Sequence, residues 1–270
     1  MKAALIGLSN NIEKNINKIK LWANSFKRHC NEEVILLCAN STPEDLKLCI
    51  DIGITPVQVT IEDVWYINHE RLKRTYEYMS GSNIDLFIIT DVFDVLFQSN
   101  PFEKLDTTTY DIFVSGEGVK VNDEPWNSDN INKIFPEYLV MCKQTEVINS
   151  GVIAGKRDAL IELFTKMYNL CESGANAHNI KDQAALIVMV SKNEIERLKI
   201  FNLDEGWAMH CAVAGPTQYF QGWGFNEKIK YGIPKMVNQT IVNKFNNKYD
   251  IVHQFNRVPE WQEILIKANA

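Results

Sequence analysis

The chain has 270 residues, of which 46% are hydrophobic and 10% aromatic, and its formal net charge is −6 at pH 7. This composition is typical of a soluble globular protein with one large α/β domain or two small ones. The acidic balance argues against a broad nucleic-acid surface. No stretch reaches the roughly 18 apolar residues that a membrane span requires, and residues 1–11 become polar too early for a secretion signal.

The cysteine pattern indicates a reducing compartment. No pair has the C-x-x-C spacing, and no group of cysteines and histidines has the spacing of a zinc site. Most of the cysteines lie among apolar neighbours, so we expect reduced core cysteines in a cytoplasmic protein rather than a disulfide framework. The six cysteines are Cys30, Cys38, Cys49, Cys142, Cys171 and Cys211.

Strand-like and helix-like segments alternate along the first hundred residues. Four apolar runs are expected as strands, at residues 2–8, 33–39, 54–62 and 84–90. Three helices are expected between them, at residues 10–29, 42–52 and 71–81. The first has apolar residues at helical spacing, and the second begins with Thr42 as its N-cap and Pro43 at the first helical position.

This βαβαβαβ order predicts an α/β fold with a central, mostly parallel sheet and helices on both faces. In such sheets, ligands bind beyond the carboxyl ends of the strands. Asp91 and Asp94 directly follow the fourth strand and therefore fall where a ligand crevice is expected. The sequence contains no Pro/Ser-rich linker and no internal repeat, and we expect a single domain over residues 1–270.

The second half of the chain is less regular. Residues 109–118 are expected as a strand that runs into a glycine-containing loop, and residues 119–135 as a polar loop with an exposed Pro125-Trp126 pair. Three further segments are expected to be structured: a strand, turn and helix at 146–170, a buried helix at 180–190, and a short strand with a histidine at 250–257.

Two carboxylates three residues apart, Asp91 and Asp94, interrupt the most hydrophobic segment of the chain. Residues three apart on a strand point to opposite faces, so the two can converge only if the backbone turns between them. Two like charges raise each other's pKa, and burying them unpaired is costly. A bound divalent cation removes both penalties, and carboxylate oxygens suit Mg²⁺ or Mn²⁺. The alternative is that Asp91 caps a turn and Asp94 pairs with a lysine or arginine.

Five segments carry, in chain order, a resemblance to a known family. They are IITDVFDVLFQ (88–98), FVSGEG (113–118), VINSGVIAGKR (147–157), KDQAAL (181–186) and IVHQFNR (251–257). The set resembles the GT-A-fold glycosyltransferases, most of all the glycosyltransferase domain of procollagen lysyl hydroxylases and related collagen-modifying enzymes. The resemblance implies a single Rossmann-like GT-A domain, with a nucleotide-binding half at 1–102 and a half for the donor sugar and the acceptor at 103–270.

Two parts of the chain depart from the pattern of that family. His253 is followed by Gln254-Phe255-Asn256-Arg257, where the family usually has a glycine or asparagine-glycine. Arg257 is expected to substitute for the diphosphate-binding loop. Residues 119–135 match no segment of the family, and we expect acceptor specificity to reside there.

The resemblance implies a metal site made of Asp91, Asp94 and His253. A mixed shell of carboxylates and imidazole favours Mn²⁺ over Mg²⁺. The cation would stabilise the charge that grows on a nucleoside diphosphate as the glycosidic bond breaks. Asp91 has the alternative role of binding the ribose hydroxyls, and His253 that of a neutral histidine hydrogen-bonded at a strand end.

Three side chains are candidates for the nucleotide. The family places a basic residue at the position of Arg71 near the diphosphate, and Arg71 and Arg257 are the expected partners of its oxygens. Trp65 can stack on the base, although a core tryptophan is an equal alternative.

The segment Asn149-Ser150-Gly151 is the candidate site for the donor sugar. Asn149 can hydrogen-bond a sugar hydroxyl and counts among the candidate catalytic residues, and glycine at position 151 would let the sugar approach the backbone closely. The alternative is an ordinary turn, because Asn-Ser-Gly is good turn chemistry.

Asp182 and Gln183 are the other candidate catalytic residues, because the family places this pair near the reacting carbon. Asn179 followed by Asp182 also resembles a capping box, which would explain both residues without a catalytic role. Glu117 and Asp204 are carboxylates at strand ends with weaker claims.

The function that the resemblance implies is transfer of a hexose from a nucleoside diphosphate sugar, expected to be UDP-linked, to a hydroxyl of a protein or saccharide acceptor, with retention of anomeric configuration. One alternative is a scaffold that binds a sugar nucleotide without turnover. Another is a phosphatase of the haloacid-dehalogenase type, whose aspartates are two residues apart on the first strand. The spacing and position of Asp91 and Asp94 argue against the phosphatase.

Overall fold

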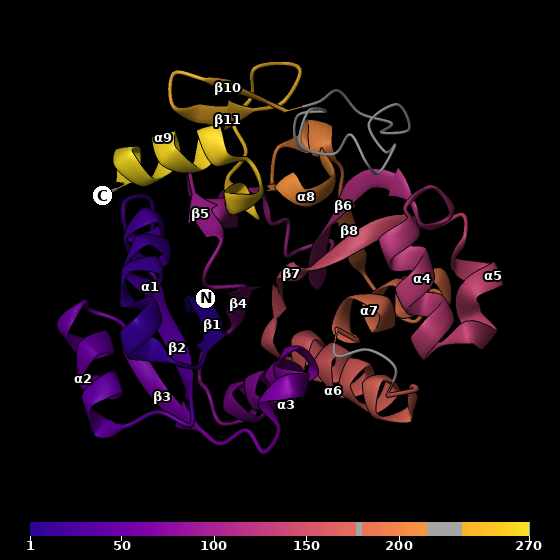
Figure 1. The fold of residues 1–270 in the computed structure, drawn as a ribbon, viewed down its shortest axis with the longest axis horizontal. Coiled ribbons are helices and arrows are strands. Elements are labelled where there is room, and N and C mark those ends of the chain that lie inside the picture. The colour runs from indigo at the N-terminus through magenta and orange to yellow at the C-terminus, as the bar shows by residue number, and fades with distance from the viewer. Residues whose placement is uncertain (177–179, 215–233, 270) are drawn as a thin grey trace.

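The computed structural model describes residues 1–176, 180–214 and 234–269, and its centre is a seven-stranded sheet (Figure 1). The strands are β1 (Ala3–Ser9), β2 (Glu33–Ala39), β3 (Thr55–Val59), β4 (Leu86–Thr90), β6 (Ile112–Lys120), β7 (Glu146–Lys156) and β8 (Leu198–Phe201). Their spatial order is β3-β2-β1-β4-β7-β6-β8. Strands β1 to β4 are mutually parallel and β8 is parallel to β6, whereas β7 is antiparallel to both of its neighbours. The expected mostly parallel α/β sheet is confirmed.

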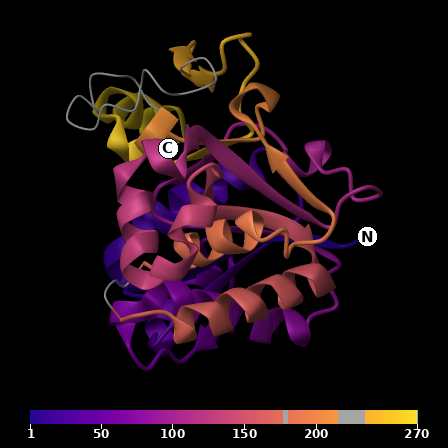
Figure 2. The same cartoon turned by 90° about the vertical axis from the view of Figure 1, so that its right-hand side faces the viewer.

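Helices pack on both faces of this sheet, as the alternation of segments predicts (Figure 1 and Figure 2). The described helices are α1 (Ile12–Lys27), α2 (Pro43–Asp51), α3 (Ile67–Ser80), α4 (Pro125–Ile134), α5 (Leu139–Cys142), α6 (Arg157–Ser173), α7 (Asp182–Ser191), α8 (Cys211–Ala214) and α9 (Pro259–Asn269). Successive residues of β1 enter different cores. Ile6 belongs to the core under α3, α6 and α7, and Leu5 belongs to the core under α1 and α2.

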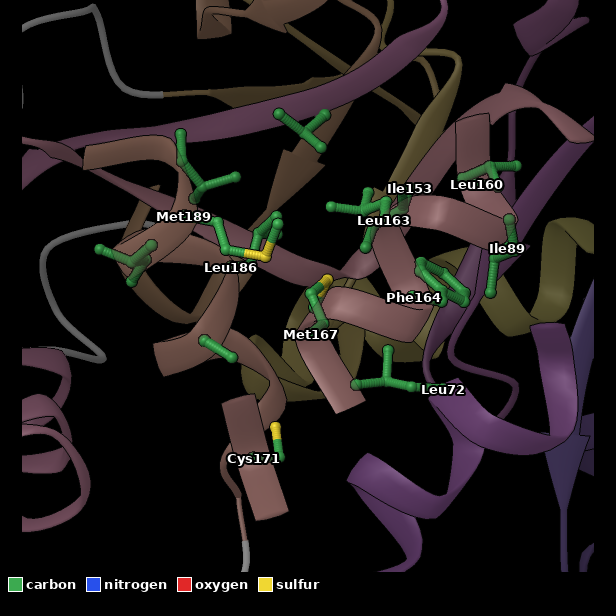
Figure 3. Close-up of a cluster of buried hydrophobic side chains, with 14 of the residues drawn as sticks. Leu72, Ile89, Ile153, Leu160, Leu163, Phe164, Met167, Cys171, Leu186 and Met189 are labelled. Atoms are coloured by element: carbon green, nitrogen blue, oxygen red, sulfur yellow. The ribbon is translucent and has the colours of Figure 1, made fainter. Parts of the chain in front are cut away.

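The larger core is centred on α6 (Figure 3). Phe164 of this helix is 1% exposed and lies in the same cluster as Leu72 of α3 and Leu186 of α7. Ile89 of β4 and Ile153 of β7 belong to the same cluster and pair with each other across the sheet. The two strands that carry most of the candidate site are therefore fixed from one side by helices.

A second, three-stranded sheet lies beside the first. It consists of β5 (Val95–Phe97), β12 (Ile251–His253) and β9 (Ala208–His210), with β12 in the centre, antiparallel to β5 and parallel to β9. Helix α9 packs against it through Trp261 and Leu265, and α9 lies at one end of the molecule together with the hairpin β10 (Lys235–Val237) and β11 (Thr240–Val242) (Figure 1 and Figure 2). This small sheet brings residues near 95, 210 and 253 together.

Several local expectations are confirmed. Thr42 caps α2, where its hydroxyl accepts from the backbone N–H of Asp45 and the Asp45 carboxylate accepts from that of Thr42. Helix α3 ends at Ser80 as expected but begins four residues earlier than expected, at Ile67. All six cysteines are buried and free. Within the described residues, no helix is long and apolar enough to cross a membrane.

The expectation of a loop at residues 119–135 is wrong, because this segment contains α4. The Glu124 carboxylate caps the helix by accepting from the backbone N–H groups of Trp126 and Asn127, and Pro125 occupies its first turn. Pro125 is exposed as expected, but Trp126 is half-buried. The helix has weak sequence signals for two reasons. Glutamate is not a preferred N-cap residue, and most residues of α4 are polar, although Ile131 and Ile134 are buried.

The expectation of a turn within residues 146–170 is also wrong. Asn149, Ser150 and Gly151 continue β7 without a break. The side chains of Asn149 and Ser150 donate to carboxylates on other elements, at 2.7 Å to Glu117 and 2.9 Å to Asp182. These tertiary hydrogen bonds replace the local ones that a turn would make.

Replacing Phe164 by alanine should lower the free energy of unfolding by about 3–5 kcal/mol, because it leaves a cavity at the centre of the larger core. Urea unfolding followed by circular dichroism measures the change. Lys166→Ala on the same helix is the control, because its exposed ion pair with Glu162 should contribute less than about 0.5 kcal/mol. Equal midpoints for the two variants would contradict this description of the core.

Candidate functional site

Asp91, Asp94 and His253 converge at the carboxyl end of β4. The chain bends through residues 91–94 before β5 begins at Val95, and this bend brings the two carboxylates together. His253 arrives from β12, which pairs with β5 so that His253 lies opposite Val95. One ligand atom from each of the three side chains lies within 4.8 Å of the other two. His253 Nε2 is 3.1 Å from Asp91 Oδ2 and 3.7 Å from Asp94 Oδ1.

The donor set of this cluster fits a divalent cation. Two carboxylates and one imidazole offer hard oxygens and one nitrogen, a combination that suits Mn²⁺ and accepts Mg²⁺ less well. Gly151 of β7 makes room for the cluster, because a Cβ at this position would lie 2.3 Å from His253 Cε1 and 2.8 Å from Asp91 Oδ2. The backbone N–H of Asp91 donates to the Gly151 carbonyl at 2.9 Å, and this bond holds the end of β4 close to β7.

Burial and mutual charge set the protonation of the three groups. Burial raises the pKa of the Asp91 carboxyl, but the Arg71 guanidinium and His253 outweigh it and hold that pKa well below its ordinary value. Burial raises the pKa of Asp94, and the Asp91 charge adds to the shift. Burial lowers the pKa of His253, but Asp94 and Asp91 reverse the shift and raise it. The cluster therefore favours a positive charge at its centre.

Arg71 joins the cluster to a second buried carboxylate. Its guanidinium donates to Asp91 Oδ1, to Asp182 Oδ2 at 2.9 Å and to the Ser150 carbonyl at 3.3 Å. Only 8% of Arg71 is exposed. The side chain that was expected near a diphosphate thus holds two carboxylates in place, and its charge helps to hold the pKa of Asp91 below its ordinary value.

Asp182 and Gln183 begin α7 and face β7. Ser150 Oγ donates to Asp182 Oδ2 at 2.9 Å, and Gln183 Nε2 donates to Asn127 Oδ1 on α4 at 2.8 Å. Lys181 is the N-cap of α7 and Asp182 is its first residue, so Asp182 does not hold the third helical position that the expected capping box requires. Asn179, the other half of that box, lies outside the described residues. Asp182 Oδ1 is buried without a hydrogen-bond partner. A buried carboxylate oxygen that lacks a partner is available to a ligand.

Glu117 and Asn149 form a buried pair behind the cluster. Asn149 Nδ2 donates to Glu117 Oε1 at 2.7 Å, and Asn149 Oδ1 accepts from the backbone N–H of Gly151 at 2.7 Å. Burial, with the nearby charge of Glu124, raises the pKa of Glu117 to about 8. Glu117 is therefore mostly protonated at neutral pH, and it supports Asn149 rather than adding a negative charge.

A cleft of about 260 Å³ opens beside the cluster. Arg71, Asp91 and Asp94 line it, together with Ser9 and Asn10 at the carboxyl end of β1. This placement agrees with the rule that ligands bind beyond the carboxyl ends of parallel strands. The cleft is large enough for part of a small ligand and is open to solvent.

Comparison with known proteins gives no matching family model and no match among curated sequences. Solved structures do match. Galactosyltransferase LgtC in complex with donor and acceptor sugar analogs aligns at a TM-score of 0.59 and 12% identity, over 93% of this chain and 86% of that one. An active-site mutant of LgtC aligns at 0.59 and 11%, over 97% and 94%. The bifunctional glycosyltransferase WbbM aligns at 0.56 and 10%, over 97% of this chain and 51% of that one.

The chain has the GT-A fold. At these identities the likeness concerns the path of the backbone alone.

Three of the candidate residues lie at or beyond the edge of this candidate site. Trp65 is 61% exposed, so its interpretation as a core residue is wrong, and it does not line the cleft. Arg257 is exposed, and its charge acts on the pKa of Asp94, which places it near the cluster. Asp204 pairs with Lys244 at 2.8 Å and lies outside the cleft.

Several residues that support the candidate site were not among the residues predicted from the sequence. Ser9 and Asn10 follow the first strand, so the rule applied to Asp91 would also have identified them. Asn127 lies in the segment expected as a loop. His210 lies behind His253 and has no sequence signal, because only the pairing of β9 with β12 brings it there. Ser115 lies in the motif FVSGEG on β6, but its contact with His210 could not be predicted from that motif.

Gly151→Ala should destabilise the protein by about 1–3 kcal/mol, because the added methyl group overlaps His253 and Asp91. Gly81→Ala is the matched control, since a Cβ there meets its nearest atom, the Tyr78 carbonyl oxygen, only at 3.8 Å. Urea unfolding of both variants tests the difference. If Gly151→Ala unfolds at the wild-type midpoint, the close packing of the cluster against β7 is incorrect.

Glu117→Gln should change how stability depends on pH. The pKa of Glu117 is 4.5 in the reference state and about 8 in the fold, so the folded protein binds this proton more tightly. Its contribution to stability is full below pH 4.5 and is lost as the pH rises toward 8. Each pKa unit corresponds to about 1.4 kcal/mol, so the wild type should lose a few kcal/mol relative to Glu117→Gln between pH 5 and pH 8. Parallel pH dependences of the unfolding free energy in the two proteins would show that Glu117 titrates normally.

Proposed function

We propose that this protein is a metal-dependent glycosyltransferase that moves a hexose from a nucleoside diphosphate sugar to an acceptor hydroxyl. The observation that carries the proposal is the convergence of Asp91, Asp94 and His253 at the carboxyl end of β4 in a GT-A fold. The hydrophobic cores on either side of the sheet do not need these three titratable groups for stability. The open cleft gives the three groups access to a ligand.

Asp91, Asp94 and His253 would hold the cation, which we propose to be Mn²⁺ because of the imidazole ligand. When bound, the cation supplies positive charge that stabilises the departing nucleoside diphosphate. Arg257 lies at the exposed edge of the same cluster, and we assign it to the diphosphate oxygens. Arg71 is committed to Asp91 and Asp182, so its contribution to the diphosphate is through the position of Asp91.

The nucleoside would occupy the cleft lined by Ser9, Asn10 and Arg71, in the half of the chain formed by residues 1–102. We propose uridine as the nucleoside. Trp65 is exposed near the start of α3, where its indole ring is free to cover a base that enters from solvent.

The donor sugar would lie between the cation and the start of α7. Asp182 offers its unpartnered oxygen to the sugar, and Arg71 and Ser150 hold its other oxygen. The amide groups of Gln183 and Asn149 are held in place by their hydrogen bonds to Asn127 and Glu117, and we propose that they contact the sugar. Among the described residues, the carboxylates that line the cleft are Asp91 and Asp94, which we assign to the cation. None is left there to activate the acceptor as a base, and we propose retention of the anomeric configuration for this reason.

Two classes of acceptor are open to the proposed enzyme. The sequence motifs resemble collagen-modifying transferases, which indicates hydroxylysine in a collagen-like chain. The LgtC structure contains donor and acceptor sugar analogs, which favours a saccharide acceptor. A panel of acceptors of both classes, assayed with the same donor, distinguishes them by which one accelerates UDP release.

Asp94→Asn should abolish the effect of Mn²⁺ on UDP binding. In the wild type, UDP with Mn²⁺ at about 100 times its dissociation constant should add about 2.7 kcal/mol to the unfolding free energy and raise the thermal midpoint. The variant should show the small effect of UDP alone, because one of three cation ligands is lost. Asp158→Asn, at an exposed carboxylate 83% accessible to solvent, is the control and should respond like the wild type.

Turnover tests the remaining part of the proposal. The wild type should release UDP slowly from a UDP-hexose in water when Mn²⁺ is present, and Asp182→Asn should reduce this release by at least tenfold while UDP binding persists. Binding of UDP without release from any UDP-sugar or acceptor would instead identify a scaffold. Release of phosphate from simple phosphate esters, with no preference for UDP, would identify a phosphatase.

A further inference from the structure

A buried chain of polar side chains lies behind His253. His253 Nδ1 is 2.9 Å from His210 Nδ1, and His210 Nε2 is 2.5 Å from Ser115 Oγ. His210 and Ser115 are fully buried, and His253 is 2% exposed. The planes of the two imidazole rings are perpendicular, and their centroids are 5.2 Å apart. The three side chains therefore form one hydrogen-bonded line that ends at the metal cluster.

The strands hold this line rigidly. β9 and β12 are parallel neighbours, and their register sets His210 directly beside His253. Ser115 comes from β6 of the main sheet, so the line also connects the two sheets. On the other side, His253 Nε2 faces Asp91 and Asp94. Only its Nδ1 is therefore turned toward His210.

Cation binding permits a single arrangement of protons along the line. A nitrogen that binds a cation offers a lone pair, so Nε2 of His253 carries no proton and its Nδ1 does. His210 Nδ1 must then accept, which leaves the His210 proton on Nε2, where it donates to Ser115 Oγ. A histidine that ligates a metal is oriented by the partner of its other nitrogen.

We propose that His210 is a positioning residue that fixes the tautomer and ring orientation of His253 for cation binding, and that Ser115 in turn fixes the tautomer of His210. This inference rests on the proposed metal site. The competing interpretation is that His210 merely fills the space between the sheets. Under that interpretation, an apolar side chain of similar size would leave cation affinity unchanged.

The first test uses the metal-free protein. Long-range ¹H–¹⁵N correlation spectra at a pH where His210 is neutral should show its proton on Nε2. In Ser115→Ala, this preference should weaken, because the acceptor for the Nε2 proton is lost. A proton on Nδ1 of His210 in the wild type would overturn the inference, whatever the protein binds.

The second test measures the dissociation constant of Mn²⁺ alone, from the electron paramagnetic resonance signal of the free ion. His210→Leu should bind Mn²⁺ about 10 to 100 times more weakly than the wild type, the usual effect of removing an outer partner of a metal ligand. His210→Asn should stay within about threefold, because its amide oxygen can accept from His253 Nδ1 as the imidazole does. The Mn²⁺ affinity of Ser115→Ala should lie between those of His210→Leu and His210→Asn.

Met209→Leu is the matched control. Met209 precedes His210 on β9 and is fully buried, but its side chain packs in the hydrophobic cluster that contains Trp261 of α9 and not in the polar line. Thermal midpoints of the metal-free variants show which of them fold. Wild-type affinity in folded His210→Leu overturns the inference. If His210→Leu does not fold, Ser115→Ala decides, and an affinity within twofold of the wild type overturns the inference.

These results are separable from failure of the proposed function. Loss of Mn²⁺ affinity in Asp94→Asn together with its retention in His210→Leu would leave the metal site intact and remove only the positioning role. A wild-type protein that binds no Mn²⁺ would remove both proposals. Weak binding by His210→Leu with rescue by His210→Asn would support the positioning role even if no sugar transfer were found.

Discussion

The contact on which the site depends is the guanidinium of Arg71 between Asp91 and Asp182. Its charge holds the pKa of Asp91 below the ordinary value, although burial alone would raise that pKa. The contact also ties three elements together, because α3 supplies the guanidinium, the end of β4 supplies Asp91 and the start of α7 supplies Asp182. Without this bridge, Asp91 and Asp182 would be buried carboxylates with no guanidinium between them.

Much of the architecture could be read from periodicity and end signals. The strands at 33–39 and 84–90 and the Thr42-Pro43 start of α2 have strong local signals, and the structure follows them. The positions of Asp91 and Asp94 followed from the rule about carboxyl ends of parallel strands. Only the family resemblance predicted that His253 joins them, because β12 reaches the cluster through its pairing with β5 and not through a local sequence signal.

The errors arose where tertiary contacts override local chemistry. Asn149-Ser150-Gly151 is good turn sequence, but the partners of its side chains lie on β6 and α7, and the segment stays extended. Residues 119–135 have a polar surface and an unusual cap, Glu124, so the helix was hidden. The role of His210 could not be seen at all, since nothing in the sequence reveals the register of β9 against β12.

The geometry of His253 has a consequence for assembly of the protein. Its contact with Asp91 spans 162 positions of the chain, and it depends on the small sheet docking against the large one. Contacts of such large sequence separation slow folding, because closing the loop costs entropy before the contact stabilises the fold. A cation held by these residues would thus recognise only the completed tertiary structure, and its occupancy would report on the integrity of the whole molecule.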